Sequence, residues 1–339
     1  MPVLLLAFAL AASAPLHAGF SHPGSLLLPD QLAAAAADSD APVILKLATD
    51  LAHEQPSAWP DFGVPAYGEN ADAQQRRVKD FQRQVRAAYV GALAARLDPT
   101  RFKPDAAVAL VRAWTASNRT ISGGDGPVVM NYLGVGLLMA ADLVWDKFTP
   151  ADIAQVREWT RTVFLRQAVV PELRRHRNNH RSWAILAGLQ AAFILDDADL
   201  FASYTRLLDQ HIALSIEPDG RQPLELARGD RAGWYSYFSL CPLLAAVQVV
   251  RNVTGEKLWD VHDGRLEAAL NYLFTHSPET DRLGAGSQSN PENLFAAVAA
   301  VYPRGAWNRD GYLNRNRPVD ASEDQHMAWE FPLVFRARR

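Results

Sequence analysis

The chain has 339 residues, 49% of them hydrophobic, and a formal net charge of −3. So weak a charge argues against generic nucleic-acid binding, and a polyanion would have to be held by a local basic cleft. The single cysteine, Cys241, cannot form an internal disulfide, which excludes a small disulfide-stapled scaffold.

Residues 1–18 have the pattern of a secretory signal. Their apolar run, residues 3–12, is too short to span a bilayer, and residues 16–18 suit a cleavage site. Polar residues and glycines interrupt even the later apolar stretch 128–145, so we expect no transmembrane helix. The pattern therefore predicts a periplasmic protein that is exported and does not insert into a membrane.

Helical periodicity dominates the remaining chain. The pair Thr149-Pro150 has the composition of a helix start, and Pro242 is expected to kink or interrupt its helix. The predicted helices span residues 42–53, 74–97, 105–117, 128–145, 150–170, 179–196, 199–216, 231–253, 266–276 and 292–301.

The predicted helices are of two kinds. Residues 74–97 and 150–170 carry a charged face, as outer helices do, whereas 128–141, 184–195 and 240–250 are apolar nearly all round. This alternation is typical of an all-α fold, an α/α toroid whose inner helices line a substrate cleft. Because no linker or internal repeat divides the chain, we predict one domain from residue 19 to residue 339.

A basic stretch at residues 174–181 precedes the apolar helix that begins near residue 179. It holds four arginines, two histidines and two asparagines. Amides, an imidazole and guanidiniums at a helix N-terminus can receive a carboxylate, because free N–H groups and the positive dipole end favour anions there. The residues alone are equally compatible with a solvated basic turn that caps the helix.

His176 and His180, four residues apart, resemble a metal-binding pair. We find no obvious third ligand in the sequence, and the surrounding arginines oppose a cation. The sequence therefore predicts no metal site and no cofactor.

The second chemical motif is Pro-Leu-Glu-Leu-Ala-Arg-Gly-Asp-Arg-Ala-Gly-Trp-Tyr at residues 223–235, in which Tyr235 follows Arg228 by seven residues. That spacing puts both residues near one face only if the segment is helical throughout. Together with Asn178-Asn179-His180, this motif resembles the alginate lyases of polysaccharide lyase family 5. The resemblance covers most of the chain after residue 18.

The resemblance implies an incomplete α/α barrel that cleaves β-1,4-linked polyuronates, foremost alginate rich in poly-β-D-mannuronate, by metal-independent β-elimination. Such a reaction needs a base at C5, an acid at the C4 oxygen and donors that neutralise the carboxylate. We expect Asn179 and Arg228 to clamp the carboxylate and Tyr235 to donate to the leaving oxygen. The base is either Tyr235 or His180, which the helix N-terminus biases toward neutral imidazole.

Four further residues are expected to bind the substrate. Residues 61–72 match a lid loop of the family, where Tyr67 fits a tyrosine but Ala66 replaces a lysine. Arg181 and Arg231 are candidate arms for the anionic polymer, although Arg231 could equally be a surface charge. Trp183 could stack on a sugar face or pack in the core.

The chain departs from the family at Ser182, which replaces a tyrosine, and at Arg221-Gln222, which replace apolar or small residues. We expect these positions, with Ala66, to border the polymer, so that polyglucuronate or hyaluronan could also be substrates. Two alternatives remain: a glycoside hydrolase on the same toroid, with Glu225 among its carboxylates, and a non-catalytic periplasmic polyuronate-binding protein. In each case the partner is an anionic polysaccharide, and we expect a monomer.

Overall fold

The computed structural model describes residues 19–38, 41–276 and 291–309. The predicted signal segment, residues 1–18, lies outside the described residues. The elements run, in chain order, α1 (Pro29–Ala36), α2 (Ala41–Leu51), β1 (Asp61–Gly63), α3 (Ala71–Leu97), α4 (Asp105–Ser117), β2 (Thr120–Ser122), α5 (Gly126–Val129), η1 (Met130–Gly134), α6 (Val135–Leu143), η2 (Trp145–Lys147), α7 (Pro150–Trp159), η3 (Thr160–Val169), α8 (Val170–Arg175), α9 (Asn179–Leu195), α10 (Ala198–Ser215), α11 (Pro223–Leu226), η4 (Gly229–Arg231), α12 (Ala232–Thr254), α13 (Val261–His276), α14 (Pro291–Val298) and α15 (Ala306–Arg309).

Each predicted helix has a counterpart, and α4 has the predicted bounds. Helix α12 continues through Pro242, so the proline does not interrupt the helix. The predicted helices 128–145 and 150–170 contain the π-helical segments η1 and η3, which were not predicted. Helices α1, α11 and α15 were not predicted, because they are too short to establish a helical period.

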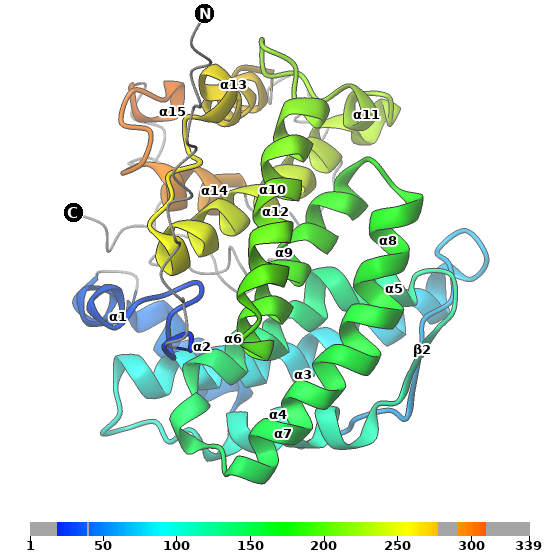
Figure 1. Cartoon of the computed structure of the whole chain (residues 1–339), viewed down its shortest axis with the longest axis vertical. Coiled ribbons are helices and arrows are strands. Elements are labelled where there is room, and N and C mark those ends of the chain that lie inside the picture. Colours follow the sequence, from blue (N-terminus) through cyan, green and yellow to red (C-terminus); the bar gives the residue numbers. More distant parts are fainter. Residues whose placement is uncertain (1–18, 39–40, 277–290, 310–339) are drawn as a thin grey trace, which may run out of the picture.

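The buried core is built around α9 and α12, which pack against each other and run through the middle of the molecule (Figure 1). Helix α9 is buried from Ser182 to Ile194, and α6 is buried along its whole length. By contrast, α4, α7 and α10 bury one face each. This pairing of inner and outer helices is an α/α toroid, as predicted.

One close approach between inner and outer helices depends on glycine. A Cβ atom added to Gly188 of α9 would lie 2.1 Å from the ring of Tyr204 on α10. Any larger residue at position 188 would therefore push the two helices apart.

Two segments of the fold are apolar and long enough to cross a membrane by composition, contrary to the expectation above. They are Gly126–Leu143 and Gly229–Thr254, and the protein itself buries 94% and 89% of their most apolar windows. Their apolar character is therefore accounted for by their position as inner helices of the toroid.

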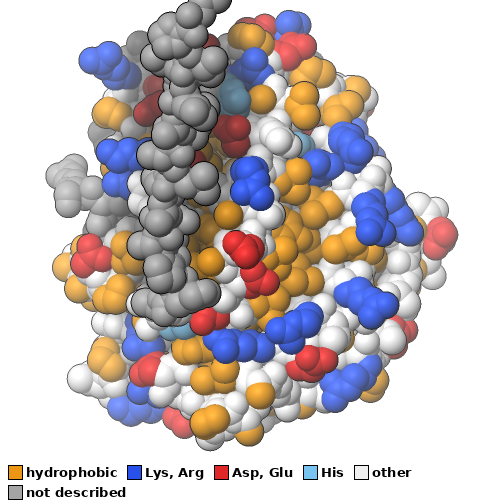
Figure 2. Space-filling view, in the orientation of Figure 1, with side chains coloured by type: hydrophobic (Ala, Val, Ile, Leu, Met, Phe, Trp, Pro, Cys, Tyr) orange, Lys and Arg blue, Asp and Glu red, His pale blue; other side chains and the backbone are white. Residues whose placement is uncertain are grey.

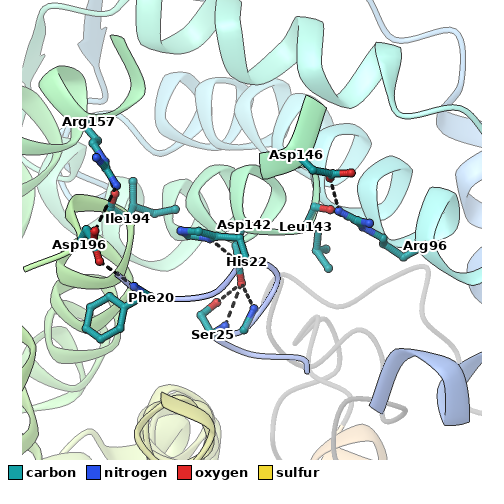
Figure 3. Close-up of polar contacts among 11 residues, drawn as sticks. Phe20, His22, Ser25, Arg96, Asp142, Leu143, Asp146, Arg157, Ile194 and Asp196 are labelled. Carbon is teal, nitrogen blue, oxygen red and sulfur yellow. Dashed lines mark hydrogen bonds and ion pairs between the residues drawn. The ribbon is translucent and has the colours of Figure 1, made fainter. Parts of the chain in front are cut away.

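The N-terminal segment is fastened to α6 and α9 by two carboxylates (Figure 3). Asp142 is buried, accepts hydrogen bonds from the backbone N and the Oγ of Ser25 at 3.0 and 2.6 Å, and lies 2.6 Å from Nδ1 of His22. The backbone N–H of Phe20 donates to Asp196 at 2.7 Å. Residues 20–25 thus cover the ends of two inner helices.

Candidate active site

The first site motif lies at the start of α9, as predicted. Asn178 is the N-cap residue, and its side chain accepts a hydrogen bond from the backbone N–H of His180 at 3.3 Å. The cap starts the helix at Asn179, so that His180 stands in its first turn. His180 is half-buried there, at the edge between core and surface.

Glu225 joins the two motifs. Its carboxylate accepts hydrogen bonds from the backbone N–H of Asn179 at 2.6 Å and from Nδ2 of Asn179 at 2.8 Å. Burial raises the pKa of Glu225, while the bonds from Asn179 and the charges of Arg228 and His180 oppose the rise. One buried carboxylate on α11 therefore interacts with three of the four predicted catalytic residues.

Asn179 itself is fully buried. One donor of its amide is engaged by Glu225, and Oδ1 has no hydrogen-bond partner among the residues that the structure describes. The expected contact of this amide with a substrate carboxylate is therefore not available at the surface of this structure. What the structure shows is that Asn179 ties the start of α9 to α11.

Arg228 and Tyr235 lie together, although the segment between them is not the continuous helix that their seven-residue spacing was expected to need. Arg228 precedes the 3₁₀ turn η4, Gly229 adopts a left-handed φ of 62°, and α12 begins only at Ala232. The turn folds the Arg228 guanidinium over the ring of Tyr235, with Cζ 4.1 Å from the ring centroid. Arg231 also approaches this ring, at 5.7 Å, and both arginines are exposed.

A second carboxylate, missed by the sequence analysis, contacts His180. Oε2 of Glu172, on α8, lies 2.7 Å from Nδ1 of His180 and 3.6 Å from Nε2 of His176. The Glu172 side chain is only 5% exposed, so little water competes for its oxygens. Burial, followed by the nearby charge of His180, lowers the pKa of His176. The signal was present in the sequence as a glutamate one helical turn before His176.

Trp183 does not have the substrate-stacking position considered above. Its side chain is fully buried and packs against Tyr132 and Phe238, with ring centroids 6.1 and 5.2 Å away. A buried indole has no free face for a sugar, so the packing alternative is the correct one.

Ser182 does not border a polymer either. Its buried Oγ lies 2.9 Å from Nε2 of His211 and 3.1 Å from Oγ of Ser239. Burial, with the charges of Arg181 and Arg177, lowers the pKa of His211 to about 3. This polar group therefore lies within the core, where it links α9, α10 and α12.

The remaining two predicted binding residues have separate surroundings. Arg181 is half-buried and donates from Nη1 to the backbone oxygen of Leu173 at 2.8 Å, which ties α9 to α8. Tyr67 is 52% exposed, and its backbone N–H donates to Asp125 at 3.0 Å. The parallel pairing of β1 with β2 holds the chain just before Tyr67.

Basic side chains gather over α8, the helix that supplies Glu172 to the site (Figure 2). A surface cavity of about 340 Å³ lies elsewhere, beside α2 and Arg101, and none of the candidate residues lines it. The candidate site is therefore identified by its side chains and charge, not by that cavity.

Comparison with known proteins gives a consistent result. A family model described as alginate lyase matches residues 35–282, more than half of the chain. A curated relative from Stenotrophomonas maltophilia (strain K279a), named polysaccharide lyase, is 31% identical over 118 residues. The match covers 33% of this chain and 34% of the relative, so the chain spans about a third of the relative's length.

Solved structures share the fold. An alginate lyase from Bacteroides ovatus has a TM-score of 0.73 at 17% identity, covering 93% of this chain and 99% of its own. Alginate lyase A1-III from Sphingomonas species A1 has a TM-score of 0.62 at 13% identity, covering 84% and 93%. A variant of alginate lyase A1-III complexed with a tetrasaccharide has a TM-score of 0.68 at 15% identity, covering 93% and 99%.

Proposed function

Because the chain belongs to the alginate lyase family, we propose that it is a polysaccharide lyase that cleaves β-1,4-linked polyuronates by metal-independent β-elimination. The observation that carries the proposal is the buried Glu225, which hydrogen-bonds Asn179 and interacts electrostatically with Arg228 and His180. Arg228 in turn lies over Tyr235. Four residues from two distant motifs are thereby gathered into one site.

Arg228 is the residue proposed to neutralise the charge of the substrate carboxylate. The C5 proton of a uronate is poorly acidic because removing it adds charge beside a carboxylate, so a cation at that carboxylate lowers the barrier. The guanidinium of Arg228 is exposed and offers parallel donors that match a carboxylate. Asn179 is fully buried and bonded to Glu225, so its part in the proposal is to hold the start of α9, and with it His180, in place.

His180 is the base in this proposal. The carboxylate of Glu172 can only accept at Nδ1, so the neutral imidazole carries its proton there and leaves the Nε2 lone pair free to take a proton. The half-buried position of His180 keeps the ring accessible from one side. The alternative, in which Tyr235 is both base and acid, needs no basic Nε2.

Tyr235 is the acid that protonates the leaving C4 oxygen. It is half-buried at the start of α12, and Trp234 packs edge-on against its ring at 4.7 Å. Together with Arg228 over its face, these contacts restrict the ring and fix the direction of its hydroxyl. A fixed donor accelerates proton transfer because no reorganisation is needed in the transition state.

Poly-β-D-mannuronate in alginate is the substrate proposed first, in line with the alginate lyases that share the fold. The departures from the family pattern at Ser182 and Arg221 give little support to other polymers once their surroundings are considered. Ser182 is buried, and Arg221 is paired with Glu217 at 3.0 Å and Asp219 at 2.8 Å. Ala66 remains as the position that favours polyglucuronate or hyaluronan.

The decisive experiment mixes purified protein separately with alginate, polyglucuronate and hyaluronan. Elimination creates a C4=C5 double bond, so absorbance near the ultraviolet edge is expected to rise, most strongly with mannuronate-rich alginate. New reducing ends without that rise would establish hydrolysis instead. Binding without either product would establish a carrier and end the proposal of catalysis.

Export to the periplasm is a separate part of the proposal, supported by the apolar run and the small residues that follow it in residues 1–18. Expression of the full chain in a Gram-negative host, followed by fractionation, is expected to yield periplasmic protein that begins near residue 19. Full-length protein in the cytoplasm would contradict it.

A further inference from the structure

Three potential metal ligands converge beside the proposed base. One ligand atom from each of Glu172, His176 and His180 lies within 4.8 Å of the others. Glu172 is buried, whereas the two histidines are partly exposed. The sequence shows a histidine pair without an obvious third ligand, and the structure supplies that ligand in Glu172.

The convergence is built into the turn between α8 and α9. Glu172 lies in α8, His176 is the C-cap residue of that helix, and His180 lies in the first turn of α9. Nη1 of Arg177 donates to the backbone oxygen of His176 at 2.8 Å and also to that of Leu173 at 3.2 Å. These bonds hold the turn in the shape that brings both imidazoles to one carboxylate.

We propose that Glu172, His176 and His180 bind one divalent transition-metal ion such as Zn²⁺, and that the bound ion inhibits the lyase. A carboxylate oxygen and two imidazole nitrogens form a donor set that zinc-like ions prefer over Mg²⁺ or Ca²⁺. The observed separations of 2.7 and 3.6 Å between donors bracket the spacing of neighbouring ligands around such an ion. Three protein ligands leave a further position for water.

Inhibition follows from the tautomer of His180 and rests on the proposed function. Without metal, the Nδ1 proton is donated to Glu172 and Nε2 is the basic nitrogen. A metal ion takes the Nδ1 lone pair, so the single proton of the neutral ring moves through water to Nε2. The number of protons on the ring does not change, but the nitrogen that served as base becomes a donor.

Neighbouring arginines set the selectivity of this site. Arg174, Arg175, Arg177 and Arg181 add positive charge around it, which opposes every cation. The guanidiniums of Arg177 and Arg181 nevertheless point at backbone oxygens, and the buried Glu172 supplies the local negative charge. Ions held by electrostatic attraction alone are therefore excluded, whereas ions with strong affinity for imidazole are retained.

The test begins with binding, which is independent of catalysis. Metal-free full-length protein is titrated with ZnCl₂ in a calorimeter and with CoCl₂ while visible absorption is recorded. We expect one ion per chain and the intense visible absorption of low-coordinate Co²⁺. His176→Ala is expected to weaken binding by at least about tenfold. His53→Ala, at an exposed histidine in the turn that follows α2, is expected to leave binding unchanged.

The second arm measures turnover. Zn²⁺ is expected to inhibit wild-type protein reversibly, with activity restored by EDTA, and Mg²⁺ at the same concentration is expected to have no effect. His176→Ala is expected to keep its basal activity and to resist Zn²⁺. Equal Zn²⁺ binding by wild type and a folded His176→Ala variant would overturn the site, and inhibition that persists in that variant would overturn the proposed inhibition by the bound ion.

A substitute variant and a readout independent of catalysis are available if the first variant does not fold or the wild type has no activity. Should His176→Ala fail to fold, as judged by circular dichroism, His176→Gln replaces it, because an amide keeps the size of the side chain but is a poor zinc ligand. Should the wild type cleave none of the polymers, the proposed function fails, yet the Co²⁺ spectrum still decides whether Glu172, His176 and His180 bind a metal ion.

Discussion

The guanidinium of Arg228 lies over the ring of Tyr235, with Cζ 4.1 Å from the ring centroid. A 3₁₀ turn and the left-handed Gly229 bring the two together, although the segment is not one helix. A cation over an aromatic face stabilises the pair electrostatically and limits the motion of both side chains. The contact therefore fixes the proposed acid beside the residue proposed to neutralise the substrate.

Replacing Tyr235 with phenylalanine is the sharpest test of the acid. The ring and its contact with Arg228 remain, and only the hydroxyl is lost. We expect turnover on alginate to fall by at least about 100-fold, with polymer binding preserved, as measured by ultraviolet absorbance and calorimetry. Undiminished turnover would remove Tyr235 from the mechanism.

Arg228→Lys separates charge from geometry. Lysine keeps the positive charge but loses the planar pair of donors that matches a carboxylate. We expect kcat to fall by about 10-fold, and by about 100-fold or more in Arg228→Ala, because a donor to the developing charge is then missing. Arg206→Ala, at an exposed arginine of α10, is the matched control and is expected to be fully active. Equal activity of the lysine variant and wild type would contradict the role of the guanidinium fork.

Glu225→Ala tests the link between the motifs. The backbone N–H and Nδ2 of Asn179 would lose their acceptor in a buried site, which costs about 1–3 kcal/mol of unfolding free energy. We expect a lower denaturation midpoint together with a loss of turnover. Glu256→Ala, at an exposed residue, should change neither. A variant that loses activity at unchanged stability would instead indicate a direct chemical role for Glu225.

Acid should destabilise the protein through His211. Burial lowers its pKa to about 3 in the folded protein, against about 6.5 in an unfolded chain. The unfolded chain therefore binds the proton first, so this contribution to stability is complete above about pH 6.5. It is lost as the pH falls from there toward about 3, by up to about 1.4 kcal/mol per pH unit.

Urea unfolding of wild type, His211→Gln and His53→Gln between pH 7 and pH 4 measures this slope. Only His211→Gln is expected to have a shallower dependence, because His53 is exposed. If the unfolding free energy of all three proteins depends equally on pH, His211 binds its proton equally well in the folded and unfolded states, which would contradict this prediction.

Removal of metal should leave the reaction intact. In the proposed scheme Arg228 supplies the positive charge that a cation provides in other lyases, so dialysis against EDTA is expected to leave turnover unchanged. The measurement compares initial rates before and after dialysis. Activity that falls on chelation and returns with a divalent ion would overturn the metal-free scheme.

Local patterns in the sequence were sufficient for the longer helices and for the family. The bounds of α4 and the start of α9 follow from apolar spacing and an asparagine cap, which act over a few neighbouring residues. The apolar character of α6, α9 and α12 likewise indicated which helices are inner. The motifs around His180 and Arg228 indicated the alginate lyases because they are short and contiguous.

Only the tertiary structure decided which side chains meet. Glu225 reaches Asn179 across 46 residues, and Glu172 reaches His180 across the turn between two helices. It also showed that Trp183 is buried, although the motif placed it beside the predicted site. Helical periodicity is a property of neighbouring residues, whereas contacts between distant carboxylates, imidazoles and amides depend on how whole helices pack.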